Sequence, residues 1–511
     1  MIYIYINNKI KTYETDIRDL CMAFFPYQKL NFLYEDSINV DKIKDIKKEK
    51  SNILIDNYFD LNENINIKNR YKIKNNLKRS LYQYLNKLTK KQLPWGALTG
   101  IRPVNIGTQI LEFIKYGEDN KSDTIKQFKD YLNENIDAVN AKNNNFKNNI
   151  DKKLIIDYLK YEYLISDDKA NLILDIAKYE VDILHKKNTK DFKNGYSIYI
   201  GVPFCKSTCL YCSFTSFNID KWSKYVDKYL DKLEFELKNK IKKLPKNKKL
   251  MTIYVGGGTP TSLSDEQFYR FLNIIYKNFD TKNIIEWTVE AGRPDTINEF
   301  KLKKMLEFGV NRISINPQTF NQKTLDLIGR KHTIYDIIDK FNLARSIGFK
   351  NINMDIILGL PNEKLKDVIN TLIEVGKLNP DSLTVHSLAL KRAARLNVEK
   401  EDWQKQYLAG IALDGEIEKM NKCSAYLASL LELKPYYLYR QKNIAGNLEN
   451  IGFAKKNKEC LYNIFMMSER HSVYGFGCGA STKIVKYLKS GEKIVERIDG
   501  LKSVVDYCKR N

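Results

Sequence analysis

Three cysteines in one short segment are the residues of this sequence with the clearest capacity for chemistry. Cys205, Cys209 and Cys212 lie in the stretch GVPFCKSTCLYCSFTSF at 201–217, directly after an apolar run at 196–200. Thiolates are soft ligands for iron–sulfur clusters, zinc or copper(I), and a loop with CxxxCxxC spacing can present all three sulfurs to one metal centre. A structural zinc site would need four protein ligands, and no histidine or fourth cysteine follows at zinc-finger spacing. The favoured interpretation is a [4Fe–4S] cluster with one iron left open for a small molecule.

The elements that must position this loop alternate between strand and helix. The apolar pattern predicts strands at 197–202, 252–256, 287–290, 312–316, 353–358 and 382–386, with amphipathic helices between them. Six such repeats predict an α/β fold in which a parallel sheet curls into a partial (β/α)6 barrel. Chemistry in such folds gathers at the carboxyl ends of the strands, and the cysteine loop follows the first of them.

The chain is long enough for three domains. Residues 1–190 open with a strand-like alternation and continue with helical periodicity, which predicts an N-terminal α+β/helical domain. Residues 191–400 form the barrel. Residues 401–511 mix helical and strand patterns with aromatic and glycine-rich stretches, and we expect an α+β domain that covers the substrate.

Composition limits the cellular setting and the partners. Of the 511 residues, 43% are hydrophobic, and the net charge is +23. No apolar run is long enough to span a membrane, and the start alternates like a strand, so we expect a cytoplasmic protein with no membrane partner. The lysines are spread throughout the chain among acidic and polar residues. This distribution favours a solvated basic surface over a specific nucleic-acid site.

Several motifs together resemble one enzyme family. The cysteine motif with Tyr211 before its last cysteine resembles the signature of the radical S-adenosylmethionine (radical SAM) enzymes. The preceding YIGVPFC and the later GGGTPT at 256–261 resemble the oxygen-independent coproporphyrinogen III oxidases and their relatives, the HemN, HemW and HemZ group. Segments such as HSLALKRAARL and YGFGCGAS resemble the HemZ branch. The resemblance spans roughly residues 90–490 and implies a radical SAM barrel with a [4Fe–4S] cluster and S-adenosylmethionine (SAM) as cofactors.

The resemblance also implies roles for residues at the strand ends. The glycine run would receive the amino group of SAM, Arg330 its carboxylate, and Asp355 its ribose hydroxyls. The full set of implied cofactor contacts is Tyr199, Tyr211, Gly257, Gly258, Thr259, Glu290, Gln318, Arg330, Asp355 and Ala389. After the sixth strand, His386, Arg392 and Arg395 are candidates to hold substrate carboxylates, and an ion-paired loop is the alternative for this run.

The leading function implied by the family is oxidative decarboxylation of coproporphyrinogen III to protoporphyrinogen IX without oxygen. Such a reaction would use a reduced flavodoxin- or ferredoxin-type electron donor. Phe214 stands where the oxidase pattern has a fourth cysteine, and Gly201 stands where it has histidine. These departures leave two alternatives open: a haem-degrading radical SAM methyltransferase and a HemW-like protein that binds haem for trafficking.

Overall fold

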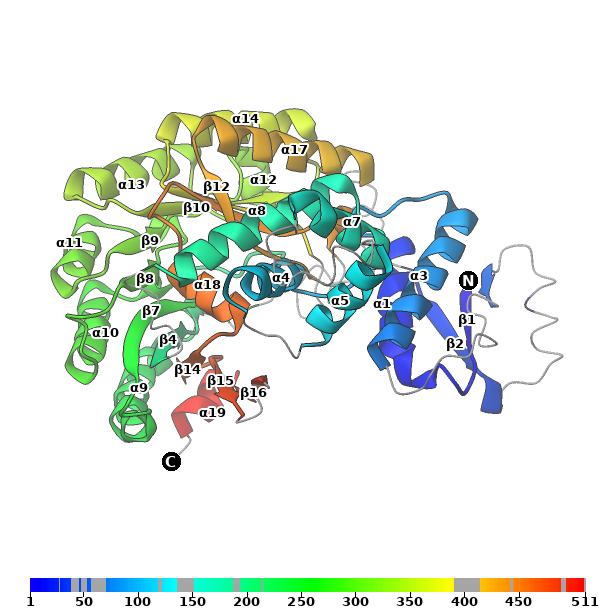
Figure 1. Cartoon of the computed structure of the whole chain (residues 1–511). Helices are drawn as coiled ribbons and strands as arrows, with labels where there is room; N and C mark the ends of the chain where they lie inside the picture. The colour runs from blue at the N-terminus through cyan, green and yellow to red at the C-terminus, as the bar shows by residue number, and fades with distance from the viewer. Residues whose placement is uncertain are drawn as a thin grey trace. The chain divides into compact units, whose positions relative to one another are not determined.

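The contacts within the chain divide it into two units, whose elements are labelled in Figure 1. One unit contains Met1–Lys178 and Arg440–Leu448, and the other contains Tyr179–Tyr439 and Glu449–Asn511. The computed structural model describes residues 1–26, 28–37, 46, 53–56, 70–117, 122–135, 151–186, 194–212, 214, 216–389, 414–441, 444–488 and 493–509.

The first unit begins with a small sheet and continues as a set of helices. Three parallel strands in the order β2-β1-β3 are formed by Leu30–Tyr34, Ile2–Ile6 and Ile53–Ile55. Alternate residues of β1 are buried in one core with α1 (Glu14–Phe24) and α3 (Arg70–Thr89), as expected for a strand with one face on a core. The other helices are α4 (Val104–Tyr116), α5 (Asp123–Asn135), α7 (Lys152–Tyr163) and most of α8 (Asp167–Leu184).

Six parallel strands form the centre of the sheet in the second unit. They are neighbours in the same order as in the chain: β4 (Gly195–Val202), β7 (Lys249–Gly257), β8 (Glu286–Glu290), β9 (Arg312–Ser314), β10 (Ile352–Leu358) and β11 (Ser382–Ser387). Helices connect successive strands and lie along the outer side of the sheet (Figure 1): α9 (Val226–Lys240), α10 (Asp265–Asn278), α11 (Glu299–Phe308), α12 (Gln322–Leu327), α13 (Ile334–Ile347) and α14 (Leu365–Leu378). This arrangement confirms the predicted partial (β/α)6 barrel.

Strands from the C-terminal part of the chain extend this sheet at both edges. β14 (Ser472–Gly477) pairs in parallel with β4, and the antiparallel strands β15 (Ser481–Tyr487) and β16 (Lys493–Asp499) continue from it. At the other edge, β13 (Asn450–Ala454) is antiparallel to β11, and β12 (Lys434–Tyr439) is antiparallel to β13. The C-terminal segment therefore contributes backbone hydrogen bonds to the barrel sheet itself.

A short helix, α18 (Leu461–Ser468), fills the inside of the curved sheet at the amino ends of its strands. Tyr462 and Phe465 share a buried cluster with residues of β7, β12 and β14. Glu286, the first residue of β8, accepts hydrogen bonds from the backbone N–H groups of Leu461 at 2.7 Å and Tyr462 at 3.2 Å. A carboxylate in this place satisfies amides that a helix N-terminus leaves without partners. Of the remaining helices, α17 (Asp414–Leu430) contacts α14, and α19 (Val504–Lys509) contacts α9.

The structure confirms all six predicted barrel strands, of which five are longer than predicted by one to four residues and one is shorter. β9 ends at Ser314, whereas the sequence pattern predicts a strand to residue 316. Pro317, which follows the predicted strand, has no backbone N–H to donate, and Gln318 after it adopts a left-handed backbone with φ of 67°. The domain boundaries expected at 190 and 400 stay predictions.

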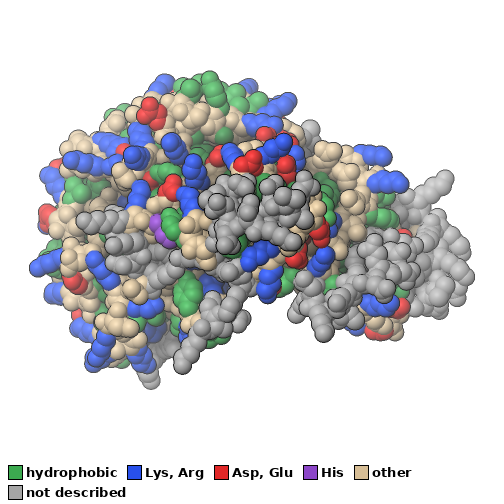
Figure 2. All heavy atoms as spheres, in the orientation of Figure 1, with side chains coloured by type: hydrophobic (Ala, Val, Ile, Leu, Met, Phe, Trp, Pro, Cys, Tyr) green, Lys and Arg blue, Asp and Glu red, His purple; other side chains and the backbone are tan. Residues whose placement is uncertain are grey.

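Basic side chains are spread over the face of the molecule shown in Figure 2, where acidic and hydrophobic side chains lie among them. Among the described residues, no helix combines the length and the apolar character needed to cross a membrane.

Candidate functional site

The cysteine loop follows the carboxyl end of β4. Cys205 lies in β5 (Phe204–Cys205), a two-residue strand that pairs with β6 (Phe217–Asn218), so the loop begins and ends at one small ladder. Cys205 and Cys209 are buried, Cys212 is partly exposed, and the backbone N–H of Cys212 donates to the Cys209 carbonyl at 3.0 Å. Within the described residues, no three His, Cys, Asp or Glu side chains are gathered closely enough to hold a single metal ion.

Burial favours the protonated form of two thiols of this loop, Cys205 and Cys212. Burial raises the pKa of Cys205 to about 12, although a hydrogen bond with Thr259, whose Oγ1 lies 3.3 Å from the sulfur, acts in the opposite direction. Burial also raises the pKa of Cys212. Thiols must lose their protons to bind a metal, so loading of this loop would release protons.

The glycine run after β7 packs directly against the start of the cysteine loop. The Gly258 N–H donates to the Val202 carbonyl at 2.7 Å, and the Thr259 N–H donates to the Phe204 carbonyl at 2.7 Å. A Cβ atom on Gly258 would lie 2.4 Å from the Phe204 oxygen, and Gly257 has a φ of 107°. Only glycine permits this approach, so the run fixes the loop against the end of the sheet.

Glu290 ends β8 and faces the interior of the barrel. Its carboxylate accepts a hydrogen bond from the Tyr254 hydroxyl at 2.6 Å, and burial raises its pKa to about 7. The ring of Tyr254 stacks on those of Tyr462 and Tyr199, with centroids 4.6 and 6.1 Å away. Tyr199, a predicted SAM contact, therefore lies in a stack of three tyrosines that also orients Glu290.

Polar atoms without partners among the described residues lie at the end of β9 and in the segments that follow it. Ser314 Oγ, Asn316 Oδ1 and Arg330 Nε are buried and have no hydrogen-bond partner among the described residues. The rest of the Arg330 guanidinium donates to the carbonyls of Asn316 and, at 2.8 Å, Gly292. Gln318 keeps its left-handed backbone here, a conformation that costs a non-glycine residue roughly 1–3 kcal/mol and is concentrated at functional sites. These atoms could bind a ligand without first breaking a hydrogen bond within the protein.

Asp355, in the middle of β10, and His386, near the carboxyl end of β11, face each other. His386 Nε2 lies 3.7 Å from Asp355 Oδ2, and the Tyr439 hydroxyl lies 3.4 Å from His386 Nδ1. Burial would raise the pKa of Asp355, but the nearby imidazole of His386 and the hydrogen bond from Asn353 outweigh it and lower the pKa. The carboxylate thus keeps its charge and can accept hydrogen bonds from hydroxyl groups.

The structure brings most of the predicted site residues together at this end of the barrel. Tyr211 and Arg330 both interact with Cys209, and the Gln318 N–H donates to the Asp355 carbonyl at 2.9 Å. Ala389 follows β11 and is partly buried. Arg392 and Arg395 lie outside the described residues, so their contact with substrate stays a prediction.

The donor set fits a cluster and a SAM molecule. Three thiols in one loop can hold a cluster with one free iron, and the unpartnered atoms of Ser314, Asn316 and Arg330 can receive the polar groups of SAM. Charged Asp355 and a Glu290 that titrates near neutrality suit hydroxyl and ammonium groups. We therefore infer that the cofactors expected from the sequence, a [4Fe–4S] cluster and SAM, fit this end of the barrel.

Arg293, which is buried, and Asp295, whose side chain is 22% exposed, also belong to this site, although no sequence motif pointed to them. Burial would raise the pKa of Asp295, but the nearby His332 and the Arg293 guanidinium lower it well below its usual range. The only signal in the sequence is the string GRPD after the third strand, where charged residues flank a proline close to Glu290.

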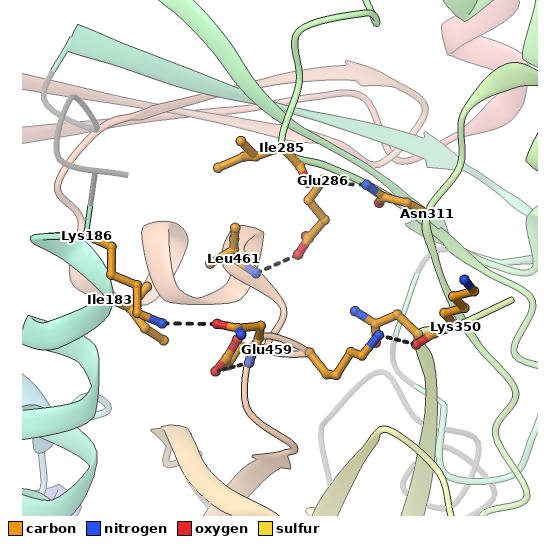
Figure 3. Close-up of a pocket in the computed structure, with 11 residues that line it drawn as sticks. Ile183, Lys186, Ile285, Glu286, Asn311, Lys350, Glu459 and Leu461 are labelled. Atoms are coloured by element: carbon orange, nitrogen blue, oxygen red, sulfur yellow. Dashed lines mark hydrogen bonds between the residues drawn. The ribbon is translucent and has the colours of Figure 1, made fainter. Parts of the chain in front are cut away.

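A hollow of about 410 Å³ lies at the opposite ends of the same strands. Its lining includes Glu286 at the start of β8 and Asn311 and Asn351 just before β9 and β10. Figure 3 shows Glu286 turned toward Leu461, and the same close-up shows Glu459, which accepts hydrogen bonds from Tyr179 and Asn457. The carboxylates of the hollow are thus used to hold the protein together.

Comparison with known proteins agrees with this geometry. The pattern of the Radical SAM superfamily matches residues 199–375. HemZ of Bacillus subtilis, named an oxygen-independent coproporphyrinogen-III oxidase-like protein, is 41% identical over 329 residues, which are 64% of each chain. The heme chaperone HemW of B. subtilis is 34% identical over 56% of this chain and 70% of its own. Coproporphyrinogen III oxidase (HemN) from Escherichia coli, a radical SAM enzyme, has a similar fold, with a TM-score of 0.50 and 21% identity over 63% of this chain and 72% of its own.

The barrel with a cysteine loop after its first strand is the architecture of a radical SAM protein. The chain belongs to the radical SAM superfamily, in the group that contains HemN, HemW and HemZ. The expected cofactors, a [4Fe–4S] cluster and SAM, are those of this family. The match spans less than two thirds of the length of HemZ.

Proposed function

We propose that this protein is a radical SAM enzyme that acts on a tetrapyrrole and converts coproporphyrinogen III to protoporphyrinogen IX by oxygen-independent oxidative decarboxylation. The observation that carries the proposal is the three-thiol loop beside unpartnered buried polar atoms at the carboxyl ends of the strands. The similarity to HemZ, whose name refers to this oxidase, supports the choice of substrate class.

The proposed roles of the residues follow from their chemistry. Cys205, Cys209 and Cys212 would hold the cluster, and Arg330 would bind the carboxylate of SAM through its free Nε. Asp355, which stays charged, would accept hydrogen bonds from ribose hydroxyls. When bound, the cluster and SAM supply the one-electron chemistry that removes a hydrogen atom from the substrate.

Further residues of the barrel would protect and orient the reaction. The stacked rings of Tyr199, Tyr254 and Tyr462 would exclude water from the part of the barrel interior next to the site. The exclusion of water strengthens the electrostatic interactions within the site. His386 lies beside Asp355 and Tyr439, where it could bind a propionate of the substrate. Arg392 and Arg395 remain proposed partners for other propionates, and a reduced flavodoxin- or ferredoxin-type protein is the proposed electron donor.

The test is anaerobic incubation of the reconstituted protein with SAM, a reductant and coproporphyrinogen III, followed by mass spectrometry of the tetrapyrroles. The proposal expects products that have lost one and then two molecules of carbon dioxide, with vinyl groups in place of propionates. An intact cluster that cleaves SAM but leaves every propionate in place would refute this choice of substrate.

A second candidate is haem binding without turnover, as the name of the heme chaperone HemW describes for that protein. It is favoured by the match to HemW, which extends over 70% of that chain. A haem titration followed by absorbance distinguishes the two. Tight stoichiometric haem binding with no SAM cleavage would favour the chaperone function, and weak or absent haem binding would remove it.

A further inference from the structure

Arg293 is a buried arginine that pairs with a single carboxylate in a fork. Its Nε lies 3.1 Å from Asp295 Oδ1, and its Nη2 lies 3.1 Å from Asp295 Oδ2. Only 3% of the Arg293 side chain is exposed, against 22% for Asp295. A guanidinium fixed by two parallel hydrogen bonds keeps one orientation, which a lysine ammonium cannot reproduce.

The remaining nitrogen of this arginine points to the cysteine loop. Arg293 Nη1 donates to Ser207 Oγ at 2.7 Å and to the Ser207 carbonyl at 3.2 Å. The same nitrogen lies 3.9 Å from the sulfur of Cys209, within hydrogen-bond reach of a thiolate. One side chain therefore contacts both the backbone of the loop and one of its metal ligands.

Contacts from a second segment hold the same part of the loop. Ser207 Oγ donates to the Gly329 carbonyl at 2.7 Å, and the Leu210 N–H donates to the Ile328 carbonyl at 3.0 Å. His332, which follows this segment, is buried, and its Nδ1 lies 3.7 Å from Asp295 Oδ1. Arg293 and Asp295 thus link the cysteine loop to the chain between α12 and α13.

We propose that Arg293, fixed by Asp295, is a positioning residue for the iron–sulfur cluster: it sets the conformation of the cysteine loop and places an N–H donor and a positive charge against the sulfur of Cys209. Groups that orient metal ligands from outside the coordination sphere typically change metal affinity or activity by roughly 10–100-fold when they are removed. Hydrogen bonds to cluster sulfurs also tune the reduction potential. A donor and a positive charge at Cys209 stabilise the reduced cluster, so they raise its potential.

This inference rests on the cluster of the proposed function, but not on the tetrapyrrole substrate. The test therefore measures the cluster itself in the reconstituted full-length protein. The variants are Arg293→Gln, which removes the charge and the fork, and Arg293→Lys, which keeps only the charge. The matched control is Arg345→Gln, because Arg345 also pairs with a carboxylate of the barrel, Asp381, at 2.6 Å, but its hydrogen bonds reach none of the described loop residues.

The measurements are the midpoint potential by EPR-monitored titration, the EPR signal of the reduced cluster, and the rate of bleaching in air. We expect Arg293→Gln to shift the potential downward, alter the EPR signal and lose iron roughly 10–100-fold faster. Arg293→Lys should give a smaller downward shift, and Arg345→Gln should match the wild type in all three measurements.

A milder variant keeps the test decisive if Arg293→Gln does not fold. Ser207→Ala removes the hydroxyl that accepts from Arg293 and donates to Gly329, and we expect faster bleaching and an altered EPR signal from it as well. Unchanged potential, EPR signal and bleaching in the folded Arg293 or Ser207 variants would overturn the inference alone. A wild-type chain that takes up no iron and sulfide would overturn both the inference and the proposed function.

Discussion

Polar residues at the two ends of the same six strands differ in what they contact. At the amino ends, Glu286 holds the N-terminus of α18, and Ser197 bonds with Thr252 and His471 at 2.6 and 2.7 Å. At the carboxyl ends, buried atoms of Ser314, Asn316 and Arg330 have no partner among the described residues. The amino end is not saturated either, because Trp287 Nε1, Arg312 Nε and Asn351 Oδ1 are also unpartnered there.

This difference indicates where the barrel stabilises itself and where it can bind a ligand. A buried polar atom without a hydrogen bond costs roughly 1–3 kcal/mol, so its retention calls for an explanation such as a missing ligand. The Asp355–His386 pair and the cysteine loop lie at the same end as these atoms. Substitutions at the two ends should therefore have separable effects on the cofactors and on the fold.

The largest effect is expected at the carboxyl end from Cys209→Ser. The variant should lose the cluster and all SAM cleavage because a hydroxyl is a poor ligand for iron in a sulfur site. Iron analysis and the absorbance of the reconstituted protein measure the loss. The control is Cys423→Ser. Cys423 is partly exposed and lies in α17, and the variant should keep a full cluster. If the Cys209 variant kept its cluster, the cysteine loop would not be the site that holds the cluster.

At the amino end, Glu286→Ala should destabilise the protein by roughly 2–3 kcal/mol, because the backbone amides of Leu461 and Tyr462 lose a charged acceptor. Urea unfolding measures the change. SAM cleavage per folded molecule should stay the same, and a specific loss of cleavage would break the division between the two ends. Glu374→Ala removes a helix-surface pair with Lys377 and should change stability by less than about 0.5 kcal/mol.

Gly258→Ala should combine a moderate loss of stability with a loss of cluster. The added Cβ would meet the Phe204 carbonyl oxygen, so the cysteine loop must shift, at a cost of about 2 kcal/mol. Thermal unfolding and iron content measure both effects. Gly415→Ala, in α17 with no atom of the described residues within 4 Å of the added carbon, should leave iron content unchanged and stabilise the helix by up to about 1 kcal/mol.

The smallest effect is a pH dependence of the cofactor-free protein. Burial raises the pKa of Glu290 from 4.5 to about 7, so the folded state binds more protons than the unfolded state between these values. Stability from this group is therefore present at low pH and is lost as pH rises toward 7. Glu290→Gln should remove about 1 kcal/mol of this dependence, since the carboxyl is partly exposed. If the free energy of unfolding changed with pH in the same way for both proteins, Glu290 would have an ordinary pKa.

The six strands, their order and the cysteine loop could be predicted because each depends on a local pattern. Apolar runs of four to eight residues identify buried strands, and three cysteines within one loop need no information from the rest of the chain. Strand order followed from the short helical connections, which place successive strands side by side.

The contacts that complete the site could not be predicted in this way. Arg293 meets Ser207 across 86 positions of the chain, and Glu286 meets Leu461 across 175. β14 pairs with the first barrel strand, and Tyr462 joins the tyrosine stack. The periodicity of these two segments does not indicate which residues they contact. Such pairings depend on how the whole sheet closes.

The most direct test of the central claim is 5′-deoxyadenosine formation by the anaerobically reconstituted protein, measured by chromatography with dithionite and SAM. The account predicts that the nucleoside forms, that its yield rises when coproporphyrinogen III is added, and that Cys209→Ser forms none. A protein with an intact cluster that leaves SAM uncleaved, with or without the tetrapyrrole, would contradict it.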